Sequence, residues 1–280
     1  MSGKQFGRVL LNTYWWLMAL PANLPAWLAD WRNRKYYPRV SEEDLVRARK
    51  SDTVFICGTG SSVLDIAPRE WEGIAKHDIL SFRDFPRQYF VKADYHVTGE
   101  VDDVDEYATV INENPLYDST LFLVQEGFMA TMGNRLIGCQ KLRKGAPVFR
   151  YRRRSRGILA PFSRSFSDDV VHGFGSVVGM VNIANLLGWK RIVQVGIDLY
   201  DHRYFYMPPN QTRSVEKAGL TFESPFTQGE RIVDQIGMWR DRMQSEGVEV
   251  YAYNPRSLLT SRLPIFERSS LVQNSFLKSE

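Results

Sequence analysis

Six short runs of apolar, often β-branched residues recur along the chain, and helical stretches separate several of them. Each run has the length of a strand that is buried on both faces. Strands that alternate with helices predict an α/β fold with a doubly wound, mostly parallel sheet. We therefore expect a single Rossmann-like nucleotide-binding domain with helices on both faces of the sheet. The six runs are residues 53–57, 79–82, 95–98, 120–124, 191–195 and 248–253.

Sequence signals for helices precede the first run and separate several of the later ones. Ser41 precedes two glutamates, which suit the first turn of a helix. A helix is also expected after the first run, through Trp71, and another over residues 176–187. Residues 230–243 place apolar side chains at helical spacing, namely Ile232, Ile236, Trp239 and Met243.

The pattern divides the chain into an N-terminal segment, 1–40, one domain, 41–268, and a tail, 269–280. Within the domain, residues 203–229 lack periodicity, which predicts a small lid or binding loop. Two cysteines and four histidines show no metal-binding spacing, so no metal site and no cofactor are predicted.

The N-terminal segment is the most apolar part of the chain. Residues 9–29 carry no charge, and basic residues flank them on both sides. Pro21 and Pro25 disfavour a spanning helix, since each removes a backbone donor. The tryptophans suit a membrane interface. We expect in-plane contact with the inner face of the cytoplasmic membrane; the alternative is packing on the protein's own domain or on a partner subunit, and a homo-oligomer is left open.

Residues 141–156 hold eight of the 36 basic residues and no acid. Such a stretch suits the phosphates of lipid headgroups, glycolipids or nucleic acid, although a solvated loop explains it equally well. No nucleic-acid partner is predicted.

A glycine-rich turn follows the first run. Its glycines allow a phosphate or ribose to approach the backbone, and its hydroxyls add donors. A tight turn without a ligand is the alternative, because the pattern lacks the third glycine of a dinucleotide site. The candidate ligands are Gly58, Thr59, Gly60, Ser61 and Ser62.

Further polar candidates lie near the fifth run. Ser176 stands where a helix begins, so it is expected to cap that helix or to face an anion. The run 191–195 ends in Asp198 and then in a loop crowded with aromatic residues. Tyrosine hydroxyls can hold a phosphate without adding charge. The loop residues are Tyr200, His202, Tyr204 and Tyr206.

Three blocks of sequence resemble the bacterial lipooligosaccharide sialyltransferases, which use CMP-sialic acid. Residues 175–200, "GSVVGMVNIANLLGWKRIVQVGIDLY", are similar to that family's central motif, in which Ser-Gly opens a helix and a strand ends in Gly-Ile-Asp-Phe-Tyr. "ICGTGSSVLDI" (56–66) looks like its nucleotide loop, and "VYAYNPRSLL" (250–259) resembles its Tyr-x-x-x-Pro-x-Ser-Leu-Leu segment. The blocks occur in family order and span most of the chain.

The resemblance implies roles for three residues. Ser176 matches a serine that helps to hold the donor, and Tyr200 and Tyr206 keep the spacing of two tyrosines that bind the donor phosphate and the departing CMP. It also implies a metal-independent enzyme. The chain departs from the family at Thr59 and Arg83, which stand where asparagines are expected, and Thr98 or Gly99 falls near a third such position.

The family's catalytic histidine has no counterpart, because no histidine follows His202. Its position falls on or next to Glu230, and a carboxylate can also act as a general base. Asp234, His202 and Glu223 are rivals, and His172 is expected to line the site from the other side.

We therefore predict an inverting, metal-independent glycosyltransferase that moves an acidic sugar, sialic acid or a Kdo-like sugar, from a CMP-activated donor to a glycan or glycolipid acceptor. One alternative is a Mg²⁺-dependent phosphotransferase like the pterin diphosphokinases, with Asp102, Asp103 and Asp105 as its acidic cluster. The other is a non-catalytic protein that binds a membrane surface.

Overall fold

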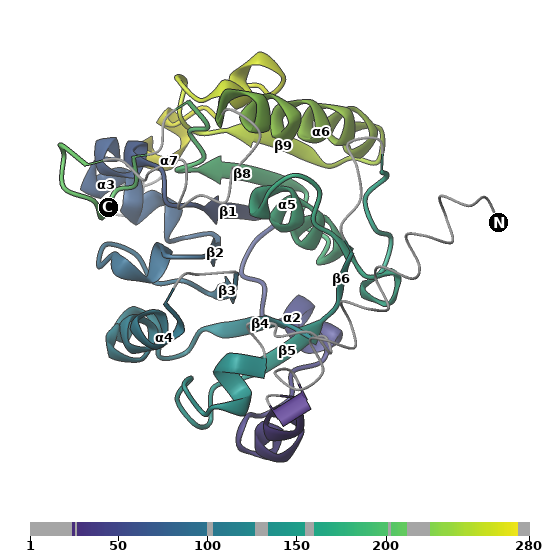
Figure 1. Ribbon diagram of the computed structural model, residues 1–280. Helices are drawn as coiled ribbons and strands as arrows, with labels where there is room; N and C mark the ends of the chain where they lie inside the picture. Colours follow the sequence, from purple (N-terminus) through teal and green to yellow (C-terminus); the bar gives the residue numbers. More distant parts are fainter. Residues whose placement is uncertain are drawn as a thin grey trace, which may run out of the picture.

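The computed structural model describes residues 24–25, 27–99, 103–126, 134–154, 160–200, 203–211 and 225–273. They form a parallel sheet with helices on both faces (Figure 1). The strands are β1 (Thr53–Cys57), β2 (Asp78–Phe82), β3 (Tyr95–Val97), β4 (Leu121–Gln125), β5 (Val148–Tyr151), β6 (Arg153–Arg154), β7 (Val170–Val171), β8 (Arg191–Val195) and β9 (Glu249–Ala252).

Seven strands make the main sheet, in the order β5-β4-β3-β2-β1-β8-β9, and every pairing in it is parallel. The chain winds outward from β1 to β5 and then returns to the other side of β1 to form β8 and β9. The strand order therefore reverses between β1 and β8. Ligands of doubly wound sheets bind at such a reversal, outside the carboxyl ends of the strands. The predicted fold class is confirmed.

Most of the α-helices lie between strands along the chain. The α-helices are α2 (Glu42–Arg47), α3 (Pro68–Ile74), α4 (Val104–Glu113), α5 (Ser176–Leu186), α6 (Pro225–Ser245) and α7 (Ser269–Gln273). The short 3₁₀ turns are η1 (Arg34–Tyr36), η2 (Ser61–Asp65), η3 (Phe85–Arg87), η4 (Pro115–Tyr117), η6 (Phe166–Asp168) and η7 (Leu258–Ser261), and η5 (Asn134–Gly138) is a π-helical turn.

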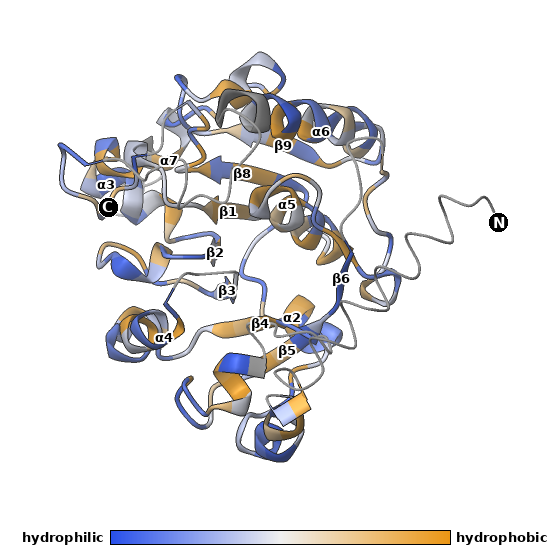
Figure 2. Cartoon of the chain, in the orientation of Figure 1, coloured by the Kyte–Doolittle hydropathy of each residue, from blue (hydrophilic) through white to orange (hydrophobic). Residues whose placement is uncertain are grey.

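Two hydrophobic clusters fill the space between the sheet and its helices. The first joins α2, α5 and α6 to one face of the sheet, and the second joins α3, α4 and α7 to the other (Figure 1). Figure 2 shows hydrophobic residues along β4, β5 and α5, whereas hydrophilic and hydrophobic residues alternate along α6. The four residues predicted to face the core from α6, Ile232, Ile236, Trp239 and Met243, are all buried.

All six predicted strands are present, and β1 and β8 have the predicted bounds. Ser41 caps α2 through a reciprocal pair of hydrogen bonds with Asp44. The helix expected through Trp71 is instead a 3₁₀ turn, η2, followed by α3, which begins at Pro68 because proline suits the first turn of a helix.

The edge strand β5 was not predicted, since it lies in the basic stretch 141–156. Its Arg150 forms two hydrogen bonds of 2.9 Å with the carboxylate of Asp30, which is 1% exposed. Three other basic residues of the stretch also pair with acids: Lys141 with Asp105, Arg143 with Asp118 and Arg152 with Asp169. Much of the expected phosphate-binding surface is therefore neutralised within the protein.

The N-terminal segment and the tail both pack on the domain in the parts that the structure describes. Asp30 ties the N-terminal segment to β5, and Leu271 of the tail is buried against Gly73 of α3. Within the predicted lid, α6 already begins at Pro225. None of the helices among the described residues is long and apolar enough to cross a membrane.

Candidate functional site

The buried carboxylate of Asp198 joins three distant parts of the chain where the strand order reverses. Asp198 is 3% exposed and follows β8. It accepts hydrogen bonds from the Ser62 amide (3.0 Å) and hydroxyl (2.5 Å), and from the Asn254 side chain (2.9 Å). Because these three donors come from distant parts of the chain, Asp198 orders the surrounding loops. Its predicted role as a nucleotide ligand stays a prediction.

The glycine-rich turn after β1 lies directly against the end of β8. The Gly60 amide donates to the Gly196 carbonyl over 2.8 Å, and a Cβ atom added to Gly60 would lie 2.7 Å from that oxygen and would also strike Asp198. Gly196 itself has φ of +63°, which favours glycine. The glycines are therefore required by the close approach of two strand ends.

Replacing Gly60 with alanine is expected to lower the free energy of unfolding by about 2–3 kcal/mol, because the new methyl group has no room. Gly179, inside α5, is the matched control, since a Cβ there would make an ordinary 3.5 Å contact with His172. Gly179→Ala should be neutral or stabilising by up to about 1 kcal/mol. Urea unfolding of both variants measures the difference, and equal values would show that the close approach at Gly60 is not needed.

Two non-glycine residues near this edge have positive φ angles. Arg83, after β2, has φ of +52°, and Leu199, after β8, has φ of +63°. Strained residues of this kind gather at functional sites. The Arg83 side chain lies beside Gly99, after β3, so the structure brings these two predicted positions together. Thr98 is different, because it is buried and its hydroxyl donates to the Leu123 carbonyl over 3.4 Å.

The tyrosines lie on both sides of the β1 end. Tyr200 is on the β9 side, where its hydroxyl accepts from Asn254 over 3.5 Å. Tyr206 is on the β2 side, where its hydroxyl donates to Asp84 over 3.4 Å and the Arg87 guanidinium lies 5.0 Å above its ring. Burial, and secondarily the charge of Asp84, raise the pKa of Tyr206, so its phenol stays protonated and can donate.

The remaining residues of this loop pack on the glycine-rich turn. The Phe205 amide donates to the Thr59 carbonyl over 3.0 Å, and Tyr204 forms a backbone bridge with Gly60. The Tyr204 and Tyr206 rings are stacked 5.6 Å apart. Arg203 donates to the Ser61 hydroxyl over 3.4 Å. Residues 203–206 of the predicted lid thus form one wall of the site.

The amino end of α5 points to the same edge of the sheet. Gly175 is the cap residue and no side chain caps the helix, so the prediction that Ser176 is the cap is wrong: Ser176 is already the first residue of the helix. The guanidinium of Arg231, on α6, lies 5.2 Å from the Phe174 ring, beside this helix end. A positive side chain and a helix amino end both favour an anion.

Two of the four candidate bases lie on α6. Gly229 packs against Leu199 at the end of β8, which places the exposed Glu230 next to the site. Glu230 and Asp234 line a hollow of about 570 Å³ between α6 and η7. Asp234 is held there by an ion pair of 3.0 Å with Arg262. His202 and Glu223 lie outside the described residues.

His172 lies against Gly179 of α5, whereas Glu230 is on α6. The predicted role of His172 in lining the site stays a prediction. Three aspartates were proposed for the alternative Mg²⁺ site. Asp102 lies outside the described residues, Asp103 caps α4, and Asp105 pairs with Lys141. Among the residues that the structure describes, no three potential metal ligands form a group.

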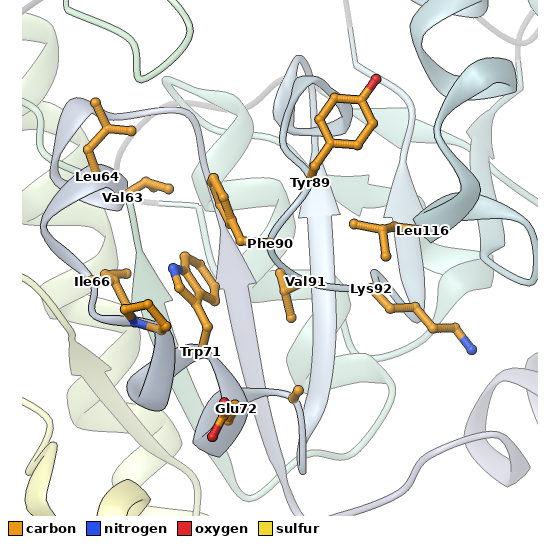
Figure 3. Close-up of a pocket in the computed structure, with 12 residues that line it drawn as sticks. Val63, Leu64, Ile66, Trp71, Glu72, Tyr89, Phe90, Val91, Lys92 and Leu116 are labelled. Atoms are coloured by element: carbon orange, nitrogen blue, oxygen red, sulfur yellow. The ribbon is translucent and has the colours of Figure 1, made fainter.

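A second hollow, of about 510 Å³, lies beside α3 rather than at the strand ends (Figure 3). The Trp71 and Phe90 rings in its wall are stacked, with their centres 5.0 Å apart, and Tyr89 projects from its rim. Its wall is mostly apolar, and it lacks the convergent polar groups of the β1–β8 edge. We therefore place the candidate site at the strand ends.

No protein-family model matches the chain, and no curated protein sequence matches it. Among solved structures, the monofunctional α-2,3-sialyltransferase Cst-I from Campylobacter jejuni is similar in structure, with a TM-score of 0.42 and 16% sequence identity over 78% of this chain and 81% of that chain. At this level the likeness carries no conclusion about activity.

Two residues at the site were missed by the sequence reasoning. Asn254 lies in the block "VYAYNPRSLL" and bonds both Asp198 and Tyr200. Arg231 directly follows the predicted base, and its cation–aromatic contact with Phe174 brings α6 to the start of α5. Asn254 could have been found, because an asparagine directly after a predicted strand is a polar side chain at the edge of the sheet. Arg231 gave no signal, since arginine is common on exposed helices.

Proposed function

We propose that the chain is an inverting glycosyltransferase that moves an acidic sugar, sialic acid or a Kdo-like sugar, from a CMP-activated donor to a glycan or glycolipid acceptor. One observation carries the proposal: the three sequence blocks that resemble the sialyltransferases meet at Asp198, which bonds Ser62 of the first block and Asn254 of the third. The blocks lie far apart in the sequence, so their meeting at the reversal point supports a shared site.

The chemistry follows from the groups around that point. Glu230 would take the proton of the acceptor hydroxyl, whose oxygen forms a bond to the anomeric carbon. The bond from that carbon to the phosphate oxygen breaks, and CMP leaves with the electron pair. Tyr200 and Tyr206 would donate hydrogen bonds to the phosphate and stabilise the departing charge. Arg231 and the amino end of α5 would hold the carboxylate of the sugar.

Nucleotide binding is the first test. We expect CMP to raise the melting temperature without Mg²⁺, and more than UMP, GMP or ATP do. Tyr206→Phe should weaken CMP affinity about tenfold, because a hydrogen bond to a charged phosphate is lost. Tyr204→Phe is the matched control and should keep wild-type affinity. A response to ATP only with Mg²⁺ would instead favour the phosphotransferase, and no response to any nucleotide would favour a binding protein.

The base has its own test. Glu230→Gln should lower turnover by about 10²–10⁴-fold while CMP affinity stays within about twofold. The control, Asp234→Asn, removes the neighbouring carboxylate and should leave turnover largely unchanged, since Asp234 is paired with Arg262. If Asp234→Asn is the inactive variant, the roles of the two residues are exchanged.

A further inference from the structure

The helical residues 24–25 and 27–33 present an apolar stripe to solvent. Leu24, Leu28 and Trp31 are 40%, 48% and 62% exposed. Their spacing of four and then three residues places them on one face of the helix. Large apolar side chains that share an exposed face mark an interaction surface.

The opposite face of this helix is attached to the domain. The buried Asp30 forms its two hydrogen bonds with Arg150 of β5, and the Asn33 side chain donates to the Gly138 carbonyl over 2.8 Å. These contacts fix the rotation of the helix about its axis. The stripe is therefore directed away from the domain.

Cations lie at the carboxyl end of the stripe. Arg32, Lys35 and Lys144 are exposed, and the Lys35 and Lys144 ammonium groups lie 5.2 and 4.9 Å from the centre of the Tyr36 ring. A hollow of about 440 Å³ opens beside them, lined by Leu28, Ala29, Arg32, Asn33, Tyr36 and Gln140. Asp30 is the sole acid among residues 24–36, and it faces inward.

An apolar stripe with cations beside it fits an anionic bilayer better than it fits a second copy of the chain. A two-fold dimer through this face would bury the stripe, but it would also gather the cations of both copies in one interface to which residues 24–36 bring no exposed acid. An anionic lipid surface instead attracts each of these cations, and tryptophan and tyrosine rings favour the headgroup region. Residues 9–23, which lead into the stripe, carry no charge.

We propose that Leu24, Leu28 and Trp31 insert into the interfacial layer of an anionic membrane, while Arg32, Lys35 and Lys144 contact lipid phosphates. The inference concerns one outer surface of the domain and holds whether or not the chain is a glycosyltransferase. It assigns membrane contact to a face whose orientation is set by the Asp30–Arg150 pair.

Co-sedimentation of the full chain with vesicles tests this proposal. We expect strong binding to an equal mixture of phosphatidylcholine and phosphatidylglycerol, and weak binding to phosphatidylcholine alone. Trp31→Ser should weaken binding about tenfold. Lys35→Glu with Lys144→Glu should weaken it at least about fivefold per cation lost. Tyr89→Ser removes an equally exposed aromatic residue, 68% exposed, at the hollow beside α3 and should bind as the wild type does.

Unchanged melting temperatures of the variants would show that the fold is intact. Binding by Trp31→Ser equal to wild type would overturn the proposal, because residues 1–23 would then suffice. Equal binding to neutral and anionic vesicles would overturn the role of the cations. A dimer in light scattering that Trp31→Ser dissociates, with no vesicle binding, would assign the face to a second copy instead.

Discussion

Asp198→Ala is expected to lower the free energy of unfolding by about 3–4 kcal/mol, since the Ser62 amide and hydroxyl and the Asn254 side chain would lose their buried acceptor. The melting temperature should fall by roughly 10 °C. CMP affinity should also be lost, because the three segments that build the site are held together by this carboxylate. Calorimetry and nucleotide titration of the same sample measure both effects.

Asp65→Ala provides the control for this change. Asp65 ends η2, close in sequence to Ser62, and its side chain is 60% exposed in an ion pair with Arg256. Exposed pairs of this kind contribute little, so the variant should stay within about 0.5 kcal/mol of wild type. If Asp198→Ala behaves like Asp65→Ala, then Asp198 does not hold the site together and its place among nucleotide ligands should be reconsidered.

Acid should destabilise the protein through His96, which lies in β3. The ring is fully buried, with Nδ1 2.8 Å from the Ser81 hydroxyl and Nε2 2.5 Å from the Tyr107 hydroxyl. Burial lowers the pKa of His96 to about 3. In the unfolded chain the His96 ring is protonated below a pH of about 6.5, whereas in the folded chain it stays neutral until the pH falls to about 3. The loss of stability therefore falls in the window between these two values.

The expected loss is about 1.4 kcal/mol per pH unit across that window, or about 5 kcal/mol in total from this residue. Other groups also titrate, so the measurement is the difference between wild type and His96→Gln in urea unfolding from pH 7 to pH 4. The variant starts less stable but should lose less stability on acidification. His77→Gln is the control: its ring is half-buried, so its removal should change the slope less. Parallel curves for wild type and His96→Gln would contradict the prediction.

The strands were readable from sequence because parallel strands covered on both faces are continuous apolar runs, as in "TVFIC" and "RIVQV". β5 was hidden by its arginine. Arg150 is compatible with a half-buried strand only because Asp30, 120 residues earlier, pairs with it. A partner so distant in sequence leaves no local signal in the residues around Arg150. For the same reason, the basic stretch 141–156 was interpreted as a surface for phosphates or a solvated loop.

The site was readable only in outline. Gly58, Gly60 and the tyrosines were predicted because a glycine-rich turn and a tyrosine-rich loop directly follow two apolar runs. The direction of the Asp198 side chain was not readable, since the same residue type in the same position can face a ligand or the core. Its actual partner, Ser62, lies 136 residues away. Sequence spacing therefore predicted which segments meet at one edge of the sheet, but not which of the polar groups there already have partners within the protein.

The pairing of β1 with β8 has a consequence for how the protein folds. β1 is a central strand, but one of its two neighbours is not synthesised until residues 191–195. A nascent chain can pair β1 with β2 early, whereas the other edge of β1 stays open, and an open apolar edge is prone to aggregation. Contacts of such large sequence separation also slow folding. Nucleotide affinity should consequently appear only at the last stage of folding, and a chain that ends before β8 should aggregate rather than bind weakly.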